Sequence, residues 1–452
     1  MSGIDRVDRS RVPQASRVQV VKFPPFIRHR LPCGLTVVAA RLPRVPLVTM
    51  ELVLQGGAQH DPAGRHGLAT LVAGMLDEGT ARRDMNTLAA SVERAGSYLT
   101  SSANWDASFV QTGGLAAHWR EGLSTLAEVA LEPTFPAVEF ERLRRQRQAE
   151  LIGRRDQPDA LAEEHFTRLL FARTAYDHML VGDLESLEAI TRDDVTSFYS
   201  AHLAADDAAL VAAGDLDPEA VMRVAGEIFA HWPAATRHAP PRVEPRAPEG
   251  VSIRLVDRPQ AAQTELRIGH AGISRLDPDR SVLRVLNSLL GGKFTSRINL
   301  NLRERHGYTY GASSRFVERF GRGPFVVSCA VSSEHAGAAT REVLGELNRL
   351  REELVSDEEL DDARNYLLGV FPYALQTADD LVDKLEDLVV YGLPNDDFER
   401  HLHNMMAVTK EDILASAQRH LHPEKAYIVA VGPEAALTPQ FDGIGTILPT
   451  GS

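Results

Sequence analysis

The histidines of this 452-residue chain are the first candidates for metal chemistry, but their spacing does not favour it. Two imidazoles four residues apart on a helix lie on one face and can bind one zinc ion together. The pairs His401/His403 and His420/His422 are only two residues apart, and each lies near the expected end of a helix. Solvated histidines are the usual finding at such ends, where positive charge is favoured. We therefore expect solvated side chains at both pairs rather than metal ligands.

We also expect no metal site or phosphate loop at the remaining candidate residues, which are two further histidines, the two cysteines and a Gly-Gly pair. His60 and His66 precede an expected helix, and their spacing favours a loop rather than a zinc site. The two cysteines, Cys33 and Cys329, lie in different halves, so neither a disulfide framework nor a cysteine-based zinc site is expected. The Gly-Gly pair at 291–292 predicts a close turn between helices, because no lysine-serine pair of a phosphate loop follows it.

The stretch 67–80, GLATLVAGMLDEGT, predicts a short helix with one buried face. It follows an apolar strand at 52–54 and a turn that contains Gly56 and Gly57. Its apolar residues recur at the i, i+3, i+4, i+7 spacing of a core-facing helix. These residues are Leu68, Leu71, Val72, Met75 and Leu76.

The other elements of the first half mix strands and long helices without regular alternation, which predicts an α+β fold. Apolar runs predict strands at 35–42, 47–54, 108–112 and 209–213. Helical patterns and start signals predict helices at 67–77, 85–95, 118–131, 136–155, 159–171 and 191–202.

The second half repeats the first. Ile190-Thr-Arg-Asp-Asp-Val and Val408-Thr-Lys-Glu-Asp-Ile are the same helix-start signal, and the strands that follow them end at Gly214 and Gly432. Both pairs are 218 residues apart, which indicates an internal duplication with too long a period for a solenoid. We expect a flexible arm at 1–25, homologous domains at 26–232 and 251–440, a proline-rich linker at 233–250 and a tail at 441–452.

Composition limits the possible partners. The net charge of −13 and the pI near 5.7 argue against a nucleic-acid partner held through its phosphates, and would suit basic peptides. A hydrophobic fraction of 44% is typical of ordinary globular proteins. No signal-peptide core and no run of 18 apolar residues are found, so we expect a cytoplasmic protein without a membrane partner.

From about Phe26 to Gly432 the chain resembles the insulinase/pitrilysin peptidases, the inverzincins, in their bacterial two-domain form. The resemblance is carried by GGAQHDPAGRHGLA in the first half, and by HAGISRLDPD, LLGGKFTSRINLNLRERHGYTYGA and VVYGLP in the second. It implies two homologous halves, each a mainly antiparallel sheet with helices packed on it. It also implies that the halves close like a clam shell around a peptide-binding chamber.

In this family the HxxEH motif supplies two zinc ligands and a general base. Here Thr70, Ala73 and Gly74 stand at those three positions, while Glu150 aligns with the family's distal ligand. One carboxylate cannot hold a catalytic zinc ion. We therefore expect no metal in this chain, and expect Glu150 to be a leftover or an ordinary helix-surface residue.

The second half keeps an arginine and a tyrosine seven residues apart, Arg303 and Tyr310. The resemblance implies that this pair faces the zinc site across the chamber, binds the substrate backbone and stabilises the oxyanion. A phenol and a guanidinium are suited to that task, because both donate hydrogen bonds to developing negative charge. Arg305 and Tyr308 are lower-ranked alternatives. The plain alternative is an arginine on a helix face and a tyrosine that starts a core strand.

These features predict the zinc-less subunit of a heterodimeric metallopeptidase. A partner chain with an intact HxxEH would hold the zinc, and this chain, inactive alone, would add Arg303 and Tyr310 to the hydrolysis of peptides. A homodimer is possible without that partner. The alternative from another class is a structural or peptide-binding homologue with no part in hydrolysis. An active peptidase with a rearranged metal site is disfavoured, because no other His/Glu cluster has workable spacing.

Overall fold

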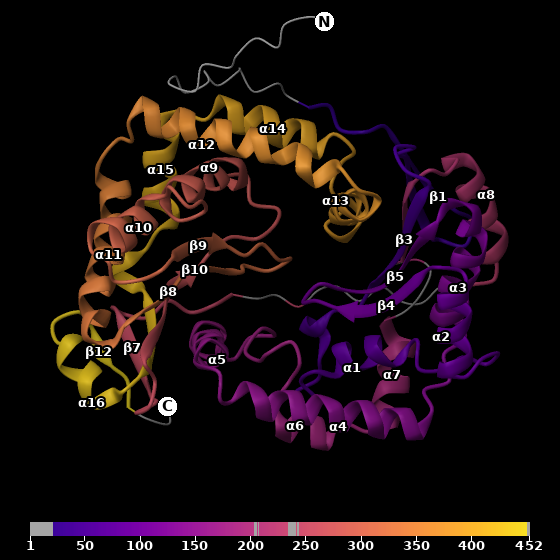
Figure 1. The fold of residues 1–452 in the computed structure, drawn as a ribbon, viewed down its shortest axis with the longest axis horizontal. Coiled ribbons are helices and arrows are strands. Elements are labelled where there is room, and N and C mark those ends of the chain that lie inside the picture. Colours follow the sequence, from indigo (N-terminus) through magenta and orange to yellow (C-terminus); the bar gives the residue numbers. More distant parts are fainter. Residues whose placement is uncertain (1–20, 203–205, 207, 234–240, 242–243, 450–452) are drawn as a thin grey trace, which may run out of the picture.

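The computed structural model describes residues 21–202, 206, 208–233, 241 and 244–449. They form two halves that lie side by side, each with a six-stranded, mostly antiparallel sheet and helices packed on it (Figure 1). The α+β prediction is therefore confirmed. The expected arm lies outside the described residues as far as residue 20, as do 234–240 and 242–243 of the expected linker.

The first sheet has the strand order β1-β2-β6-β3-β5-β4, in which only β2 and β6 run parallel. Its strands are β1 (Phe26–Arg30), β2 (Thr36–Arg41), β3 (Leu47–Gln55), β4 (Tyr98–Ala103), β5 (Ala107–Leu115) and β6 (Ala209–Gly214). Valine, leucine and alanine fill β2, β3 and β6 because both faces of these central strands are covered.

The second sheet has the corresponding order β12-β7-β11-β8-β10-β9. Its strands are β7 (Ser252–Asp257), β8 (Gln263–Ala271), β9 (Ala312–Phe316), β10 (Pro324–Ser332), β11 (Tyr427–Gly432) and β12 (Thr446–Ile447). The pair β7/β11 is parallel, as β2/β6 is, and Gly432 lies opposite Asp257 as Gly214 lies opposite Arg41. The homology of the two halves is thus visible in their strand order and register.

Helices cover these sheets. In the first half they are α1 (Leu68–Met75), α2 (Met85–Arg94), α3 (Trp119–Leu131), α4 (Ala137–Arg154), α5 (Pro158–Phe171), α6 (Leu184–Ala189), α7 (Arg192–His202) and α8 (Pro218–Ile228). In the second half they are α9 (Arg280–Leu290), α10 (Arg297–Asn299), α11 (Ala336–Glu352), α12 (Asp357–Val370), α13 (Ala378–Val390), α14 (Asp397–Ala407), α15 (Lys410–His420) and α16 (Glu434–Leu437). A short π-helix, η4 (Leu300–Arg305), continues α10. Helix starts carry the expected signals, such as the capping boxes at Ser356, Thr377 and Thr409.

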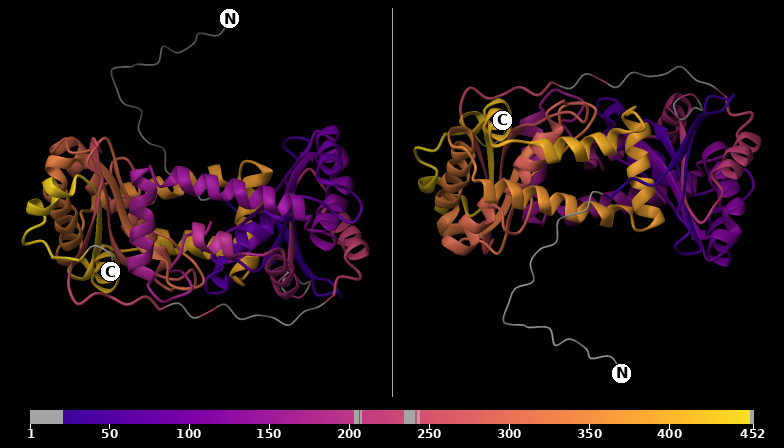
Figure 2. Two further views of the ribbon diagram at one scale, coloured as in Figure 1. Left: turned by 90° about the horizontal axis from the view of Figure 1, so that it is seen from below. Right: turned by 90° about the horizontal axis from the view of Figure 1, so that it is seen from above.

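One helix of each half packs on the sheet of the other half. Helix α5 of the first half packs on β8 and β11 of the second sheet, and α13 of the second half packs on β3 and β6 of the first sheet (Figures 1 and 2). The face of the first sheet that meets α13 forms a separate hydrophobic cluster with it. The two helices occupy equivalent places in the duplicated chain, so the exchange is reciprocal.

The segment after 440 is part of the second half rather than a tail. Phe441 is fully buried, and β12 pairs in parallel with β7, so this segment completes the sheet. The segment packs on the second half because this removes the apolar ring of Phe441 from water.

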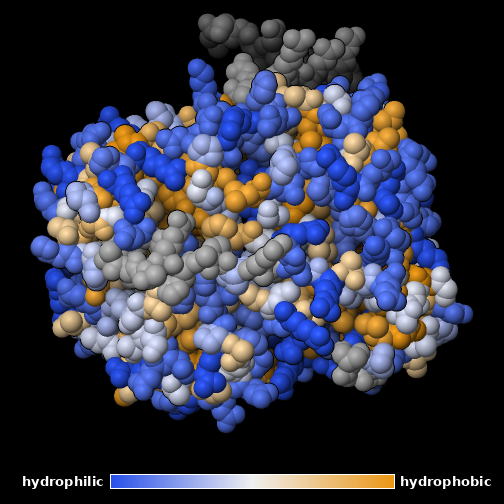
Figure 3. Space-filling model, turned by 180° about the vertical axis from the view of Figure 1, so that it is seen from behind, coloured by the Kyte–Doolittle hydropathy of each residue, from blue (hydrophilic) through white to orange (hydrophobic). Residues whose placement is uncertain are grey.

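The outer surface is largely polar. Seen from behind, the molecule is mostly hydrophilic, with hydrophobic residues in separate patches (Figure 3). None of the helices in the described residues has both the length and the apolar character needed to cross a membrane.

Candidate functional site

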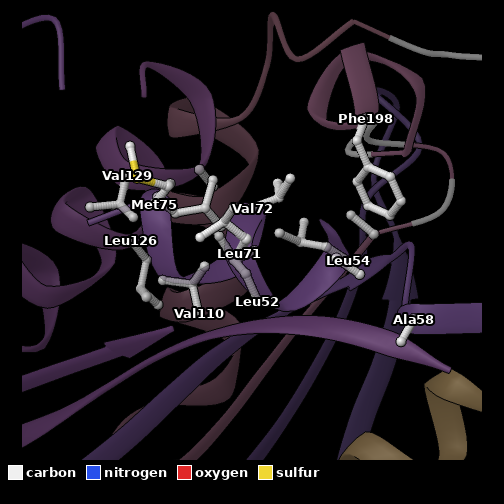
Figure 4. Packing of buried hydrophobic residues seen from close by; sticks show 14 of the residues in the cluster. Leu52, Leu54, Ala58, Leu71, Val72, Met75, Val110, Leu126, Val129 and Phe198 are labelled. Atoms are coloured by element: carbon white, nitrogen blue, oxygen red, sulfur yellow. The ribbon is translucent and has the colours of Figure 1, made fainter. Parts of the chain in front are cut away.

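Helix α1 is confirmed as a core-facing helix of the first half. Leu71, Val72 and Met75 lie among side chains of β3, β5 and α3 (Figure 4). Its N-terminus is held by Asp61, whose carboxylate accepts hydrogen bonds from the N–H groups of Gly67 (2.7 Å) and Ala69 (2.8 Å). Burial raises the pKa of Asp61 to about 7 against the effect of these backbone hydrogen bonds. The helix is therefore a packed and capped scaffold element.

The residues at the three HxxEH positions do not fit a zinc ion. The hydroxyl of Thr70 donates to the carbonyl oxygens of Gly67 (2.9 Å) and Leu180 (3.2 Å). Ala73 is fully buried. A Cβ at Gly74 would lie 3.2 Å from Cδ2 of Leu143 and 3.8 Å from Nη2 of Arg147. A guanidinium therefore occupies the space beside the second ligand position, where its charge would repel a metal cation.

Glu150 lies exposed on α4 and is engaged by its own helix. Its carboxylate accepts hydrogen bonds from Nη1 of Arg147 (2.9 Å) and Nε2 of Gln146 (3.1 Å). Partial burial opposes ionisation, but these two hydrogen bonds hold the pKa of Glu150 below its usual value. The carboxylate is thus already neutralised by the arginine that faces Gly74.

The prediction of solvated histidines is wrong for His401 and His420. Nδ1 of His401 lies 2.7 Å from the hydroxyl of Ser281, and burial lowers its pKa to about 3. Nε2 of His420 lies 2.7 Å from Oδ2 of Asp279, to which Arg419 is also paired. Both helices pack against α9, and these imidazoles contact residues at the start of that helix.

One group of metal-ligand types is found among the described residues, at Asp277, Asp279 and His420. It lies at the start of α9 and not on α1. Arg419 and His420 already pair with the carboxylate of Asp279, so the group is best described as an ion-pair cluster.

Arg303 lies in η4, with its guanidinium stacked over the ring of Phe294 at 4.4 Å. Phe294 is 64% exposed, which is unusual for a ring of this size. Among the described residues, Arg303 forms an ion pair with the neighbouring Glu304 alone, at 3.6 Å. Its Nη1 makes no hydrogen bond within the described part of the chain. The guanidinium is therefore oriented by stacking, and its Nη1 is buried without a hydrogen-bond partner among the described residues.

Tyr310 lies between η4 and β9, and its side chain is 90% exposed. It is therefore not the core tyrosine of the plain alternative. Its backbone is held tightly, because the hydroxyl of Thr309 bonds to the carbonyl oxygens of Gly311 (2.8 Å) and Ala330 (2.7 Å). The side chain of Asn299 accepts a hydrogen bond from the N–H of Ala312 at 3.0 Å. The phenol thus projects from a loop that is fixed on both sides.

The two near-neighbour alternatives have different surroundings. Tyr308 is half-buried, with its ring near those of His306 (4.9 Å) and His335 (4.6 Å). Arg305 is exposed at the last position of η4. Of the two tyrosines, Tyr310 is the one whose phenol is open to a ligand.

Two residues of this region were not identified from the sequence. Phe294 follows the Gly-Gly turn among polar neighbours, and a lone aromatic residue does not reveal from the sequence whether its ring is exposed. Arg147 sits in a run of charged residues on α4, where nothing distinguishes it from Arg144 or Arg145. The available signal was the face of α4 that packs against α1, since a residue on that face lies beside the degenerate motif.

Known proteins resemble the chain over most of its length. The family model "Insulinase (Peptidase family M16)" matches residues 36–183, and the model "Peptidase M16 inactive domain" matches residues 189–367. An uncharacterized zinc protease of Rickettsia bellii is 23% identical over 343 residues, which are 76% of this chain and 82% of that protein.

Two further relatives are of a non-peptidase or inactive kind. The non-peptidase homolog YmxG of Helicobacter pylori is 23% identical over 358 residues, 77% of this chain and 81% of that protein. The crystal structure of a peptidase M16 inactive domain from Pseudomonas fluorescens is 28% identical, with a TM-score of 0.84, and covers 90% of this chain and 98% of that chain.

Proposed function

This chain belongs to the insulinase family of peptidases (M16), and from that premise we propose that it is the zinc-less subunit of a two-chain metallopeptidase. Its own HxxEH positions hold Thr70, Ala73 and Gly74, so the metal and the activated water are supplied by a partner with an intact motif. This chain supplies part of a peptide-binding chamber, together with Arg303 and Tyr310.

The observation that carries the proposal is the accessibility of the Tyr310 phenol beside the loss of the first-half ligands. The phenol is 90% exposed on a fixed loop, and Arg303 is stacked on Phe294 with a buried Nη1 that has no partner among the described residues. Fixed donors are what stabilisation of an oxyanion requires, because they need no reorganisation when charge develops. In the proposed complex Tyr310 donates to the carbonyl oxygen under attack and Arg303 binds the substrate backbone.

The experiment is reconstitution. The full chain is purified alone and mixed with a family chain that carries HxxEH, and peptide cleavage and zinc content are measured for each sample. We expect chelator-sensitive cleavage by the mixture and neither cleavage nor stoichiometric zinc for this chain alone. Zinc-dependent cleavage by this chain alone would contradict the proposal.

An Arg303→Gln variant provides the matched comparison. It should lower the cleavage rate of the mixture, whereas Arg305→Gln, which removes an exposed charge two residues away, should leave the rate unchanged. Peptide binding without cleavage in every mixture would favour the peptide-binding alternative instead.

A further inference from the structure

A cavity of about 340 Å³ lies in the second half, and the proposed peptidase role does not use it. Its walls come from α9, α12, α13 and α14, and neither Arg303 nor Tyr310 lines it. The volume is at the small end of the range of ligand sites, which is roughly 300–1,000 Å³. Part of its lining is apolar, mainly Leu367, Val370, Phe371, Phe398 and Met405.

Four cations also line the cavity, and part of their charge is not neutralised. Arg275 pairs with Asp387 (3.1 Å) and Glu318 (3.4 Å), and Arg280 pairs with Glu318 (2.8 Å) and Asp397 (3.4 Å). The remaining two cations of the cavity make no ion pair with any residue that the structure describes. They are Arg284 on α9 and Lys384 on α13. In a chain of net charge −13 this is a local excess of positive charge.

Arg275 gives an independent sign of a missing acceptor. Its side chain is only 3% exposed, yet its Nη1 has no hydrogen-bond partner among the described residues. An unpaired donor buried in this way calls for an acceptor that the chain itself does not provide. Arg275 lines the cavity, so that acceptor would come from a bound ligand or its water.

His401, which also lines the cavity, responds to this charge. Burial first, and then the four cations of the cavity, lower its pKa to about 3. The imidazole is therefore neutral at physiological pH and adds no positive charge of its own. It remains available as a hydrogen-bonding group beside Ser281.

We propose that this cavity binds a carboxylate carried on an apolar body, with Arg275, Arg284 and Lys384 holding the carboxylate and the apolar lining residues holding the body. A guanidinium matches the planar carboxylate, and an ammonium adds a second charge-assisted hydrogen bond. Glu318 and Asp387 in the wall disfavour a dianion such as phosphate, because they leave only a small positive excess. A fatty acid and the C-terminal residue of an apolar peptide share the required chemistry.

The test is calorimetric titration of the full chain with octanoate and with octanamide. A parallel titration uses trileucine as the free acid and as its C-terminal amide. We expect at least one acid to bind, and its amide to bind about 10-fold more weakly or worse, the effect of losing a charge-assisted hydrogen bond. Preference for octanoate would identify a fatty-acid-like ligand, and preference for trileucine a peptide terminus; either supports the proposal.

Variants connect binding to the cavity. Arg284→Gln/Lys384→Gln should weaken binding of the preferred acid about 10- to 100-fold, and Ala374→Phe should abolish it by filling the cavity. Lys22→Gln/Arg223→Gln removes the same charge at exposed positions outside the cavity and should bind normally. The proposal is wrong if no acid binds, if the amides bind equally well, or if Ala374→Phe and the cationic variant both bind like the wild type while folding normally.

Discussion

At the scale of single residues, the phenol of Tyr310 is the group on which the proposed catalytic role depends most. Its exposure is extreme for an aromatic residue, and exposed aromatic side chains on fixed loops are often binding groups. Its neighbour Tyr308 has the same chemistry but is half-buried against two histidine rings. The two tyrosines therefore provide a matched test of position.

Tyr310→Phe should lower the turnover of the reconstituted pair roughly 10- to 1000-fold, since it removes one donor to the oxyanion. The phenyl ring keeps the shape of the side chain, so the chain should fold normally. Tyr308→Phe is the control and should change turnover little. Steady-state peptide cleavage measures both, and an unchanged rate for Tyr310→Phe would remove this residue from the mechanism.

The degenerate motif on α1 gives a second residue-scale prediction. Restoring it as Thr70→His/Ala73→Glu/Gly74→His should not restore stoichiometric zinc, because Arg147 faces position 74 and position 73 is fully buried. Crowding against Leu143 should also lower the free energy of unfolding by about 1–3 kcal/mol. Elemental analysis and urea unfolding measure the two effects. One zinc ion per chain with wild-type stability would show that the site is intact apart from its ligands.

At the scale of elements, the exchanged helix α13 joins the two halves through a hydrophobic contact. Its buried residues Leu381, Val382, Leu385 and Leu388 pack against alanine and valine side chains of the first sheet. These contacts are hydrophobic and cross between the halves, so they stabilise the first half with residues that belong to the second. The same holds in reverse for α5, whose Phe166 packs in the core cluster that includes Val429 and Val431 of β11.

Leu385→Ala should therefore lower the free energy of unfolding by about 2–5 kcal/mol, the range for deleting a buried leucine side chain. Because the leucine lies between the halves, unfolding should remain a single transition shifted as a whole. Leu276→Ala, at an exposed leucine, should stay within about 0.5 kcal/mol of the wild type. Calorimetry with two resolved transitions in Leu385→Ala would show that the halves are energetically independent.

At the scale of the whole molecule, polar groups also join the halves. The carboxylate of Asp106 accepts hydrogen bonds from the hydroxyl of Tyr391 (2.8 Å) and the backbone N–H of Phe320 (3.2 Å), both in the second half. The guanidinium of Arg319 lies 4.5 Å from the ring of Trp105 and 4.7 Å from that of Tyr176. These contacts fix the loop between β9 and β10 on the first half.

The contact between α13 and the first sheet also contains a buried acidic pair. Glu51 of β3 meets Glu386 of α13, with Asp379 and Asp383 nearby. Burial first, and then the charge of Asp383, raise the pKa of Glu51 to about 8, and burial and the charge of Glu51 raise that of Glu386. The amide of Gln111 donates to Glu51 at 3.3 Å. At neutral pH the pair therefore holds a proton.

Stability should consequently fall as the pH rises. A carboxyl whose pKa is raised by folding binds its proton more tightly in the native state than in the unfolded state. Its contribution to the free energy of unfolding is therefore complete below the ordinary carboxyl pKa, and is lost as the pH rises through about 8. Glu51→Gln should flatten this loss, whereas Glu121→Gln, at an exposed glutamate, should not. Urea unfolding between about pH 5 and pH 9 measures the slope. An equally steep fall in Glu51→Gln would exclude the pair as its origin.

The sequence by itself determined the family, the α+β class, the duplication and the chemistry that is absent from α1. These properties depend on residue types and on spacing along the chain, such as the apolar stripe of 67–77 and the repeated signals at 190 and 408. In the first half, strands β1 and β4 and helix α6 were not predicted, because their short or weakly apolar patterns give little signal. Helix α8 was also missed, although Asp217 and Pro218 form a helix-start signal before an amphipathic segment.

Only the tertiary structure decided which elements from distant parts of the chain meet. The exchange of α5 and α13, the burial of His401, the arginine that faces Gly74 and the cationic cavity all arise from contacts between residues far apart in sequence. A local pattern states that a face is buried but not what covers it, because burial is non-directional and any complementary apolar surface satisfies it.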